Sequence, residues 1–198
     1  MAKGPHYRLP FKRRRDGKTD YKARKAFLLS RRLRLVIRGS LKNMIAQIIS
    51  AKPKGDEVLV SAHSRELTRD YGWKASRGNI PTAYLTGLLC GLKAEEKGIE
   101  KAVLDLGLNS PIKGGRIFAA LKGVLDSGIK VPYNKEKIPD EARIEGQHIA
   151  DYAEKLTANP EEYKARFSRY LKKKLPPEEI PEHFRKVKKN IIESGSGE

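Results

Sequence analysis

The hydrophobic residues of this chain change their spacing along the sequence, and the first part of the pattern predicts a small sheet. Residues 33–38 alternate between apolar and basic side chains, which is typical of a strand with one exposed basic face. Residues 43–50 and 58–60 are two further runs rich in β-branched side chains, and they follow turns at 39–42 and 53–56. Such short links predict an antiparallel meander of three strands.

The middle of the chain changes to helical spacing. Residues 63–79 are rich in polar, basic and aromatic groups and predict a loop. Pro81 is suited to the first turn of a helix that continues to Gly98 and carries an apolar face of leucines. Gly87 and Gly91 lie four residues apart on this helix, so we expect them to let it lie close to the sheet.

The remaining pattern completes an α/β fold. Residues 102–106 are a mostly apolar run after the helical crossover, which predicts a buried strand parallel to one strand of the meander. Helices are predicted over 117–128 and 144–156, the second with Tyr152 on its apolar face, and two short helices are expected beyond residue 159. The predicted architecture is a mixed sheet, an antiparallel three-strand meander plus a crossover strand, packed with helices.

Composition bounds how the chain is organised. With 198 residues and 38% hydrophobic content it can bury one ordinary core, and we expect a basic arm at 1–30, an α/β domain at 31–158 and a helical C-terminal extension at 159–198. The single Cys90 allows no internal disulfide, which suits a reducing cytoplasm. The longest uncharged window, 78–92, is too short to span a membrane, and no leader is recognisable, so neither anchor nor signal peptide is expected.

Positive charge is concentrated at the start of the chain. Residues 1–42 hold fifteen Lys or Arg and two Asp, a net charge of +13, while the whole chain carries +18. Like charges resist compaction, so such a segment is favoured where a polyanion neutralises it, and phosphate backbones are the commonest polyanion. Tyr7, Phe11 and Tyr21 lie among the cations, where aromatic rings can stack on bases. We expect the arm to be disordered in the free protein and to order on binding RNA.

Two alternative interpretations of the arm require no specific RNA contact: a solubilising tail and a nuclear-import patch. A membrane-surface role is a third alternative, although the arm lacks the amphipathic apolar face that such binding requires. Between these, the interleaved aromatic residues and the strand cations favour an RNA-binding arm that shares one surface with the folded domain.

A glycine-containing loop at 110–116, before a predicted helix, is a candidate phosphate contact. Free backbone N–H groups at a helix start can bind a phosphate, but the spacing matches neither common nucleotide-binding pattern. We therefore favour contact with an RNA phosphate, and a nucleotide site or an ordinary helix cap are the alternatives.

Asp105 raises the possibility of an enzyme. A carboxylate on a central strand is how nucleases of the ribonuclease-H type begin a two-metal site, so a metal-dependent nuclease is the alternative function. The other candidate ligands, Asp56, Glu57 and Asp126, lie at loop or helix ends, and the four His are scattered. We expect no metal site, no cofactor and no enzymatic activity, and we expect Cys90 to be a small core residue.

Several blocks of the sequence resemble one protein family. They are Gly4–Arg15 with Gly17–Tyr21, Arg77–Leu85, Val103–Leu108 and Lys113–Gly123, and in the tail Arg166–Leu171 and Ile180–Phe184. Together they closely resemble the archaeal branch of the L-eighteen family of large-subunit ribosomal proteins. One departure is visible before Pro176, where the resemblance leads us to expect a glycine and this chain has Lys174-Leu175.

The resemblance implies a non-catalytic, cytoplasmic protein of the large ribosomal subunit. It implies binding to 5S rRNA and docking of that RNA, within the central protuberance, against the large-subunit rRNA and a neighbouring 5S-binding ribosomal protein. No membrane or small-molecule substrate is expected. The implied fold is related to the ribonuclease-H-like sheet found in the translational machinery, which would explain Asp105 as inherited architecture.

The basic N-terminal region contacts RNA in the family, and this carries over to residues from Arg8 to Arg24. Strand and loop cations extend the predicted surface into the folded domain. The residues predicted to contact RNA are Arg8, Lys12, Arg13, Arg14, Arg15, Lys18, Tyr21, Arg24, Arg31, Arg32, Arg34, Arg38, Lys74, Arg77, Lys113 and Arg116.

Overall fold

A four-stranded mixed sheet is the centre of the fold. The computed structural model of the protein describes residues 4–52 and 55–195. The strands are β1 (Arg34–Gly39), β2 (Met44–Ser50), β3 (Glu57–His63) and β4 (Val103–Asp105). Their order is β3-β2-β1-β4, with β1, β2 and β3 antiparallel and β4 parallel to β1. The predicted meander with a parallel crossover strand is therefore confirmed.

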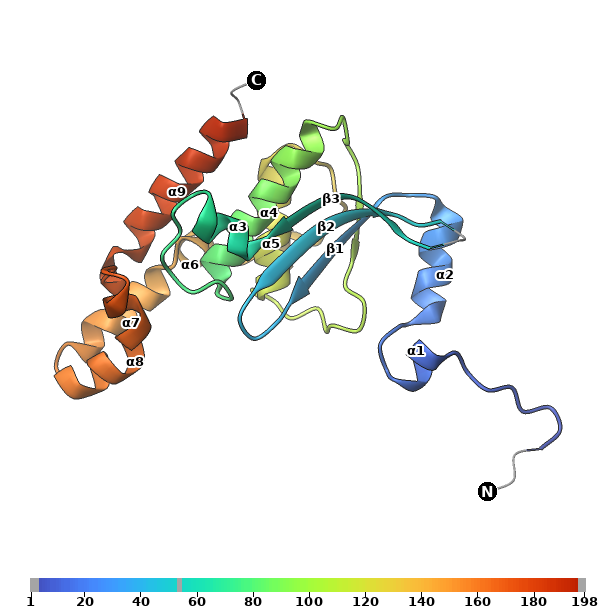
Figure 1. Cartoon of the computed structure of the whole chain (residues 1–198), viewed down its shortest axis with the longest axis horizontal. Coiled ribbons are helices and arrows are strands. Elements are labelled where there is room, and N and C mark those ends of the chain that lie inside the picture. The colour runs from blue at the N-terminus through green and yellow to red at the C-terminus, as the bar shows by residue number, and fades with distance from the viewer. Residues whose placement is uncertain (1–3, 53–54, 196–198) are drawn as a thin grey trace.

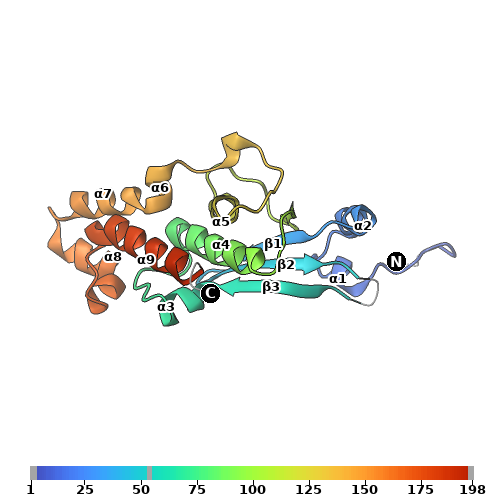
Figure 2. The same ribbon diagram turned by 90° about the horizontal axis from the view of Figure 1, so that it is seen from above.

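Helices precede, cover and follow this sheet. They are α1 (Lys12–Arg15), α2 (Tyr21–Ser30), α3 (Ser64–Arg69), α4 (Ile80–Glu95), α5 (Arg116–Asp126), α6 (Glu141–Glu145), α7 (Gln147–Leu156), α8 (Pro160–Lys172) and α9 (Ile180–Gly195), with 3-10 turns η1 (Lys135–Lys137) and η2 (Pro177–Glu179). Figures 1 and 2 show that the N-terminal segment with α1 and α2 lies at one end of the molecule, while α7 and α8 lie at the opposite end.

The core lies between one face of the sheet and the helices α4 and α5, and α9 extends it by packing against α4. Leu35 and Ile37 of β1 are fully buried there, because alternate residues of a strand point to the same face. Phe184 of α9 belongs to the same cluster, so the C-terminal extension packs onto the body of the protein. A smaller cluster around Phe167 joins α7 to α8.

Close packing of α4 against α5 depends on glycines. A Cβ built on Gly87 would lie 1.9 Å from the backbone oxygen of Ala120, and one on Gly91 would lie 1.9 Å from Oγ of Ser127. Both glycines therefore face α5, and the prediction that they bring α4 close to the sheet is wrong. Leucines of α4 belong to the same hydrophobic cluster as the buried residues of the sheet.

Two local predictions are corrected by the structure. The predicted loop at 63–79 begins with α3, because the imidazole of His63 and the carboxylate of Glu66 form a reciprocal cap at its start. The predicted helix at 144–156 is interrupted by Gly146, whose φ of 97° ends α6 and starts α7 in a new direction. Tyr152, expected on the buried face, is 42% exposed.

The C-terminal extension contains the two expected helices, and α9 is longer than expected at sixteen residues. Between them the backbone turns at Lys174, whose φ of 52° is a conformation that glycine adopts more easily. The turn therefore forms with a lysine near the position where a glycine was expected. The end of the polar tail, residues 196–198, lies outside the described residues, as do 53 and 54 of the predicted turn at 53–56.

Candidate RNA-binding surface

The arm presents its cations on the surface. Lys12 to Arg15 form the single turn α1, and their side chains are exposed, as are those of Arg8 and Lys18. Neither acidic residue of this segment pairs with a cation of α1. Asp16 lies 3.6 Å from Lys18, and Asp20 accepts hydrogen bonds from the backbone N–H groups that begin α2. Within residues 4–20, most of the positive charge therefore has no carboxylate of its own segment to neutralise it.

An aromatic pair and a capped helix give the arm local structure. The rings of Phe11 and Tyr21 lie 5.0 Å apart, and Nε of Arg13 donates a hydrogen bond to Thr19 at 2.8 Å. Phe11 remains 70% exposed, so part of its ring is available for stacking. The last part of the arm forms the helix α2, which begins at Tyr21 because the side chain of Asp20 caps its first turn.

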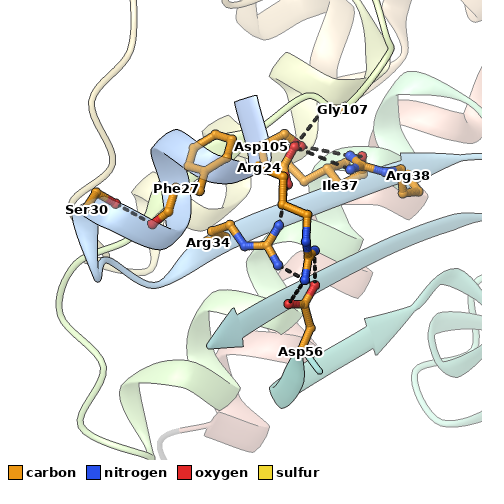
Figure 3. A network of polar contacts seen from close by, with 9 residues as sticks. All are labelled: Arg24, Phe27, Ser30, Arg34, Ile37, Arg38, Asp56, Asp105 and Gly107. Carbon is orange, nitrogen blue, oxygen red and sulfur yellow. Dashed lines mark hydrogen bonds and ion pairs between the residues drawn. The ribbon is translucent and has the colours of Figure 1, made fainter. Parts of the chain in front are cut away.

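A network of ion pairs holds α2 against the sheet (Figure 3). The guanidinium of Arg24 donates two hydrogen bonds of 2.7 Å to Asp56, which precedes β3. Arg34 on β1 bridges two carboxylates, donating to Asp56 at 2.5 Å and to Asp105 at 3.0 Å. Arg38 donates to the backbone oxygen of Asp105 at 2.8 Å. These contacts fix the base of the arm to β1, β3 and β4.

The electrostatics of this network are those of a neutralised cluster. The hydrogen bonds from Arg24 lower the pKa of the Asp56 carboxyl against the opposing effect of burial, and the same contact raises the pKa of Arg24. Arg34 is only 4% exposed, and Phe27 lies against its guanidinium with the ring centroid 6.0 Å away. A buried guanidinium requires such partners, because desolvation of an unpaired charge is costly.

The prediction of an exposed basic face on β1 is therefore wrong for Arg34. Its side chain does point to the face of the sheet away from α4 and α5, but two carboxylates distant in sequence, Asp56 and Asp105, enclose it. Arg24 and Arg38 are partly exposed, so they retain a surface beside their ion pairs. Arg31 and Arg32, at the end of α2, are exposed.

The carboxylates considered for a nuclease are engaged in structural contacts. Asp105 faces Arg34 and Arg38 and also accepts the backbone N–H of Gly107 at 2.8 Å. Asp126 accepts from the hydroxyl of Tyr84 at 2.8 Å, on the other helix of the α4–α5 pair. Among residues 4–52 and 55–195, no group of three or more His, Cys, Asp or Glu is arranged to hold a metal ion.

The glycine-containing loop before α5 uses its N–H groups within the protein. Gly114 donates to the carbonyl of Lys137 at 3.0 Å, and Gly115 donates to the carbonyl of Ile112 at 3.2 Å. The expectation that these two groups are free for a phosphate is therefore wrong. Arg116 donates to the carbonyls of Ser40 and Gly78, which ties α5 to the β1–β2 turn, whereas Lys113 is exposed.

Lys74 and Arg77 lie beside α8, and Figure 1 shows α8 at the end of the molecule opposite the arm. They share a groove with cations that the sequence reasoning did not select. These additional cations are Lys42, Arg166, Arg169, Lys172 and Lys173. The spacing of three residues between Arg166, Arg169 and Lys172 was the available signal, because residues three apart are neighbours on the surface of a helix.

Cys90 and His183 have structural roles. Cys90 is buried, and burial raises the pKa of its thiol to about 12, which confirms the prediction of a core cysteine. His183 stacks on Trp73 with ring centroids 5.0 Å apart, and its Nε2 accepts the backbone N–H of Lys74 at 3.1 Å. None of the described helices is long and apolar enough to cross a bilayer.

The structure defines a basic α/β protein whose body carboxylates are neutralised by ion pairs and whose N-terminal arm carries exposed cations. Comparison with protein families makes this specific. The family described as "Ribosomal large subunit proteins 60S L5, and 50S L18" matches residues 5–100 and 91–134, so the chain belongs to this family. It is a protein of the large ribosomal subunit, and the resemblance seen in the sequence is confirmed.

Proposed function

We propose that this protein binds 5S rRNA and helps attach it to the large-subunit rRNA in the central protuberance, beside a neighbouring 5S-binding ribosomal protein. Membership of the ribosomal family supports this proposal. The observation that carries it is the set of exposed arm cations from Arg8 to Lys18, whose own segment supplies carboxylates only to Lys18 and to the start of α2. The proposed role is structural, and no catalytic step is part of it.

The proposed contacts follow the exposure of each cation. Arm side chains supply phosphate contacts and Phe11 and Tyr21 supply stacking, since irregular RNA is bound through its backbone and unstacked bases. Exposed residues of the body add further contacts, with Lys74 and Arg77 on a separate surface beside α8, and Arg34 is removed from the set. The proposed RNA-binding residues are Arg8, Lys12, Arg13, Arg14, Arg15, Lys18, Tyr21, Arg24, Arg31, Arg32, Arg38, Lys74, Arg77, Lys113 and Arg116.

We also propose that the body is related to the ribonuclease-H-like sheet. The order β3-β2-β1-β4, with β4 parallel to β1, supports this relationship. The proposed functional division is an arm at 1–30, a body at 31–158 and an extension at 159–198. The ion pair between Arg24 and Asp56 joins the first two parts, so an arm deletion that removes α2 would also disturb the body.

Titration of 5S rRNA with the full-length chain tests the proposed function. The variant Arg8→Gln/Arg14→Gln/Arg15→Gln removes three exposed arm charges without touching the hydrogen bond of Arg13. We expect it to weaken 5S rRNA binding strongly. The slope of log K against log salt should be about −5 for the wild type, as expected when six phosphates are neutralised, and should become less negative by roughly three in the variant.

The control removes two charges from the opposite end of the molecule. Lys155→Gln/Lys164→Gln neutralises two exposed lysines of α7 and α8, and we expect 5S rRNA binding to change less than twofold. An arm variant that binds 5S rRNA as tightly and with the same salt slope as this control contradicts the proposal.

A further inference from the structure

A pocket of about 840 Å³ opens between the end of α5, the start of β4 and the segment 128–133. Leu33, which precedes β1, forms another part of its wall. This volume is in the range of sites that hold a small ligand or a few residues of a bound peptide. The RNA contacts proposed above use only Arg32 among its lining residues.

The walls of this pocket are largely apolar. Leu33 and Leu125 are partly buried and pack against the main hydrophobic core, and Val131 is a buried member of that core. Tyr133 adds an aromatic wall and is 42% exposed. An apolar group of a ligand would lose its contact with water here, which is the main favourable contribution to most protein association.

The carboxylate of the pocket is already engaged. Asp126 is the one acidic residue among the lining residues that the structure describes. It accepts a hydrogen bond of 2.6 Å from Nζ of Lys122 and one of 2.8 Å from the hydroxyl of Tyr84. A nucleobase between the apolar walls would leave its hydrogen-bonding edge without partners, which is costly, whereas an aliphatic or aromatic side chain has no such edge. The walls therefore favour an apolar side chain.

Unmatched cations surround the opening of the pocket. Arg32, Lys101 and Lys130 line it, come from three separate segments and are exposed. Within residues 4–52 and 55–195, no carboxylate forms an ion pair with any of these three side chains. Because Lys122 matches the charge of Asp126, the pocket retains three unmatched positive charges. Charge complementarity then calls for a ligand that carries carboxylates around its apolar group.

Backbone contacts form this pocket before any ligand binds. Lys130 pairs with Lys101 as in a parallel ladder. The N–H of Ala102 donates to the carbonyl of Lys130 at 3.1 Å, and the N–H of Lys130 donates to the carbonyl of Glu100 at 2.8 Å. Gly128, with a φ of 98°, turns the chain from α5 toward these contacts. A wall that is fixed in advance lowers the entropic cost of binding.

We propose that this pocket is a docking site for a segment of another protein in which an apolar side chain is flanked by carboxylates. The apolar side chain lies between Leu33, Leu125 and Tyr133, and the carboxylates face Lys101 and Lys130. A second copy of this chain is a poor occupant, because each copy carries a net charge of +18 and like charges repel. The inference does not depend on which RNA the arm binds.

The test uses the full-length chain loaded with 5S rRNA, so that RNA occupies the cations of the arm. A fluorescein-labelled hexapeptide, Asp-Glu-Leu-Phe-Glu-Asp, is titrated into this complex and followed by anisotropy. Two further peptides separate the two requirements: one has Ser in place of both apolar residues, and the other has Asn and Gln in place of the carboxylates. We expect the first peptide to bind about tenfold more tightly than either of the others.

Variants of the chain assign this binding to the pocket. Lys101→Gln/Lys130→Gln removes two of the unmatched charges, and Tyr133→Ser removes the aromatic wall from an exposed position. We expect each to weaken binding of the acidic apolar peptide about fivefold or more, with an unchanged urea midpoint showing that the variant is folded. Lys155→Gln/Lys164→Gln is the matched control, because it removes two exposed charges outside the pocket, and it should stay within about twofold of the wild type.

Photocrosslinking locates the bound peptide directly. With photoleucine in place of its Leu, the peptide should crosslink to residues 123–135, as read by mass spectrometry of tryptic fragments. Crosslinks confined to the arm overturn the proposal, as does failure of the peptide to bind or an equal effect of the pocket and control variants.

Other occupants of the pocket are separate outcomes that also overturn the proposal. A labelled RNA hairpin whose binding depends in the same way on Lys101 and Lys130 assigns the pocket to RNA. Octanoate that displaces the labelled peptide at a lower concentration than unlabelled peptide does assigns the pocket to small amphipathic anions.

The docking site and the proposed function fail in distinguishable ways. If the chain binds 5S rRNA but the complex does not bind the acidic apolar peptide, the docking site is refuted and the proposed function stands. If the chain does not bind 5S rRNA, the free chain is titrated with the same peptide. A loss of binding in the pocket variants and not in the control then supports the docking site while the proposed function is refuted.

Discussion

The ion-pair network at the base of the arm predicts a specific loss of stability for Asp105→Asn. Asparagine keeps the shape of the side chain and can still accept the N–H of Gly107, but it removes the negative charge that faces Arg34 at 3.0 Å. Arg34 is 4% exposed and Asp105 is 7% exposed, so water replaces little of the lost interaction. The guanidinium remains buried with Asp56 as its one strong partner.

The size of the effect follows from this partial loss. Removing the sole partner of a buried charge costs about 3–5 kcal/mol, and because Asp56 remains we expect Asp105→Asn to lower the free energy of unfolding by about 2–3 kcal/mol. Glu57→Gln is the control, because Glu57 pairs with Lys52 at the surface and such pairs contribute less than about 1 kcal/mol.

Urea unfolding followed by the fluorescence of Trp73, the single tryptophan, measures both variants. Trp73 is fully buried, so unfolding exposes its indole to solvent. The midpoint shift multiplied by the urea dependence gives the change in free energy. If Asp105→Asn is no less stable than Glu57→Gln, the argument that Asp105 neutralises a buried arginine is refuted.

Three further predictions concern packing, pH and backbone strain. Gly87→Ala should destabilise the protein by about 1–3 kcal/mol, because its Cβ would overlap the carbonyl of Ala120, whereas Gly195→Ala, with no contact below 3.4 Å, should change stability little in the same urea assay. Burial and then the charges of neighbouring lysines lower the pKa of His183, so the stability that its neutral imidazole contributes is present above about pH 6.5 and is lost as the pH falls through the folded pKa. Between about pH 7.5 and pH 5 the free energy of unfolding should therefore decrease less in His183→Gln than in the wild type. Equal decreases would contradict this prediction. Lys174→Gly should raise the melting temperature, because the positive φ at this position costs about 1 kcal/mol for a residue with a side chain. A lower melting temperature would show that contacts of the lysine outweigh this strain.

Local patterns predicted the strands and main helices because each has an apolar face of regular period. Alternation located β1, and the run at 102–106 contained β4 together with its parallel pairing. The helix α3 was missed because its cap is supplied by the imidazole of His63, a residue type that the usual capping patterns do not include. The break at Gly146 was missed because the apolar spacing continues through it.

The burial of Arg34 could not be predicted from its neighbours in sequence. Its position on β1 is correct for an exposed face, and the partners that enclose it are 22 and 71 residues away. Only the pairing of β4 beside β1, and the path of the chain into β3, bring those carboxylates to it. Arg34 was predicted to contact RNA, but its long-range ion pairs give it a structural role instead.

The groove beside α8 shows why net charge along a segment differs from charge on a surface. Residues 159–198 contain ten basic and seven acidic side chains, and because their net charge is small the sequence predicted no RNA contact in this segment. Folding separates the two kinds: Glu178 accepts hydrogen bonds from Tyr163, while Arg169 and Lys172 lie on the groove face of α8. Lys74 and Arg77, nearly a hundred residues earlier, then complete a cationic surface on a nearly neutral segment. For a protein that contacts RNA, the relevant quantity is thus the number of cations left without carboxylates after folding, and the structure places such cations at both ends of this molecule.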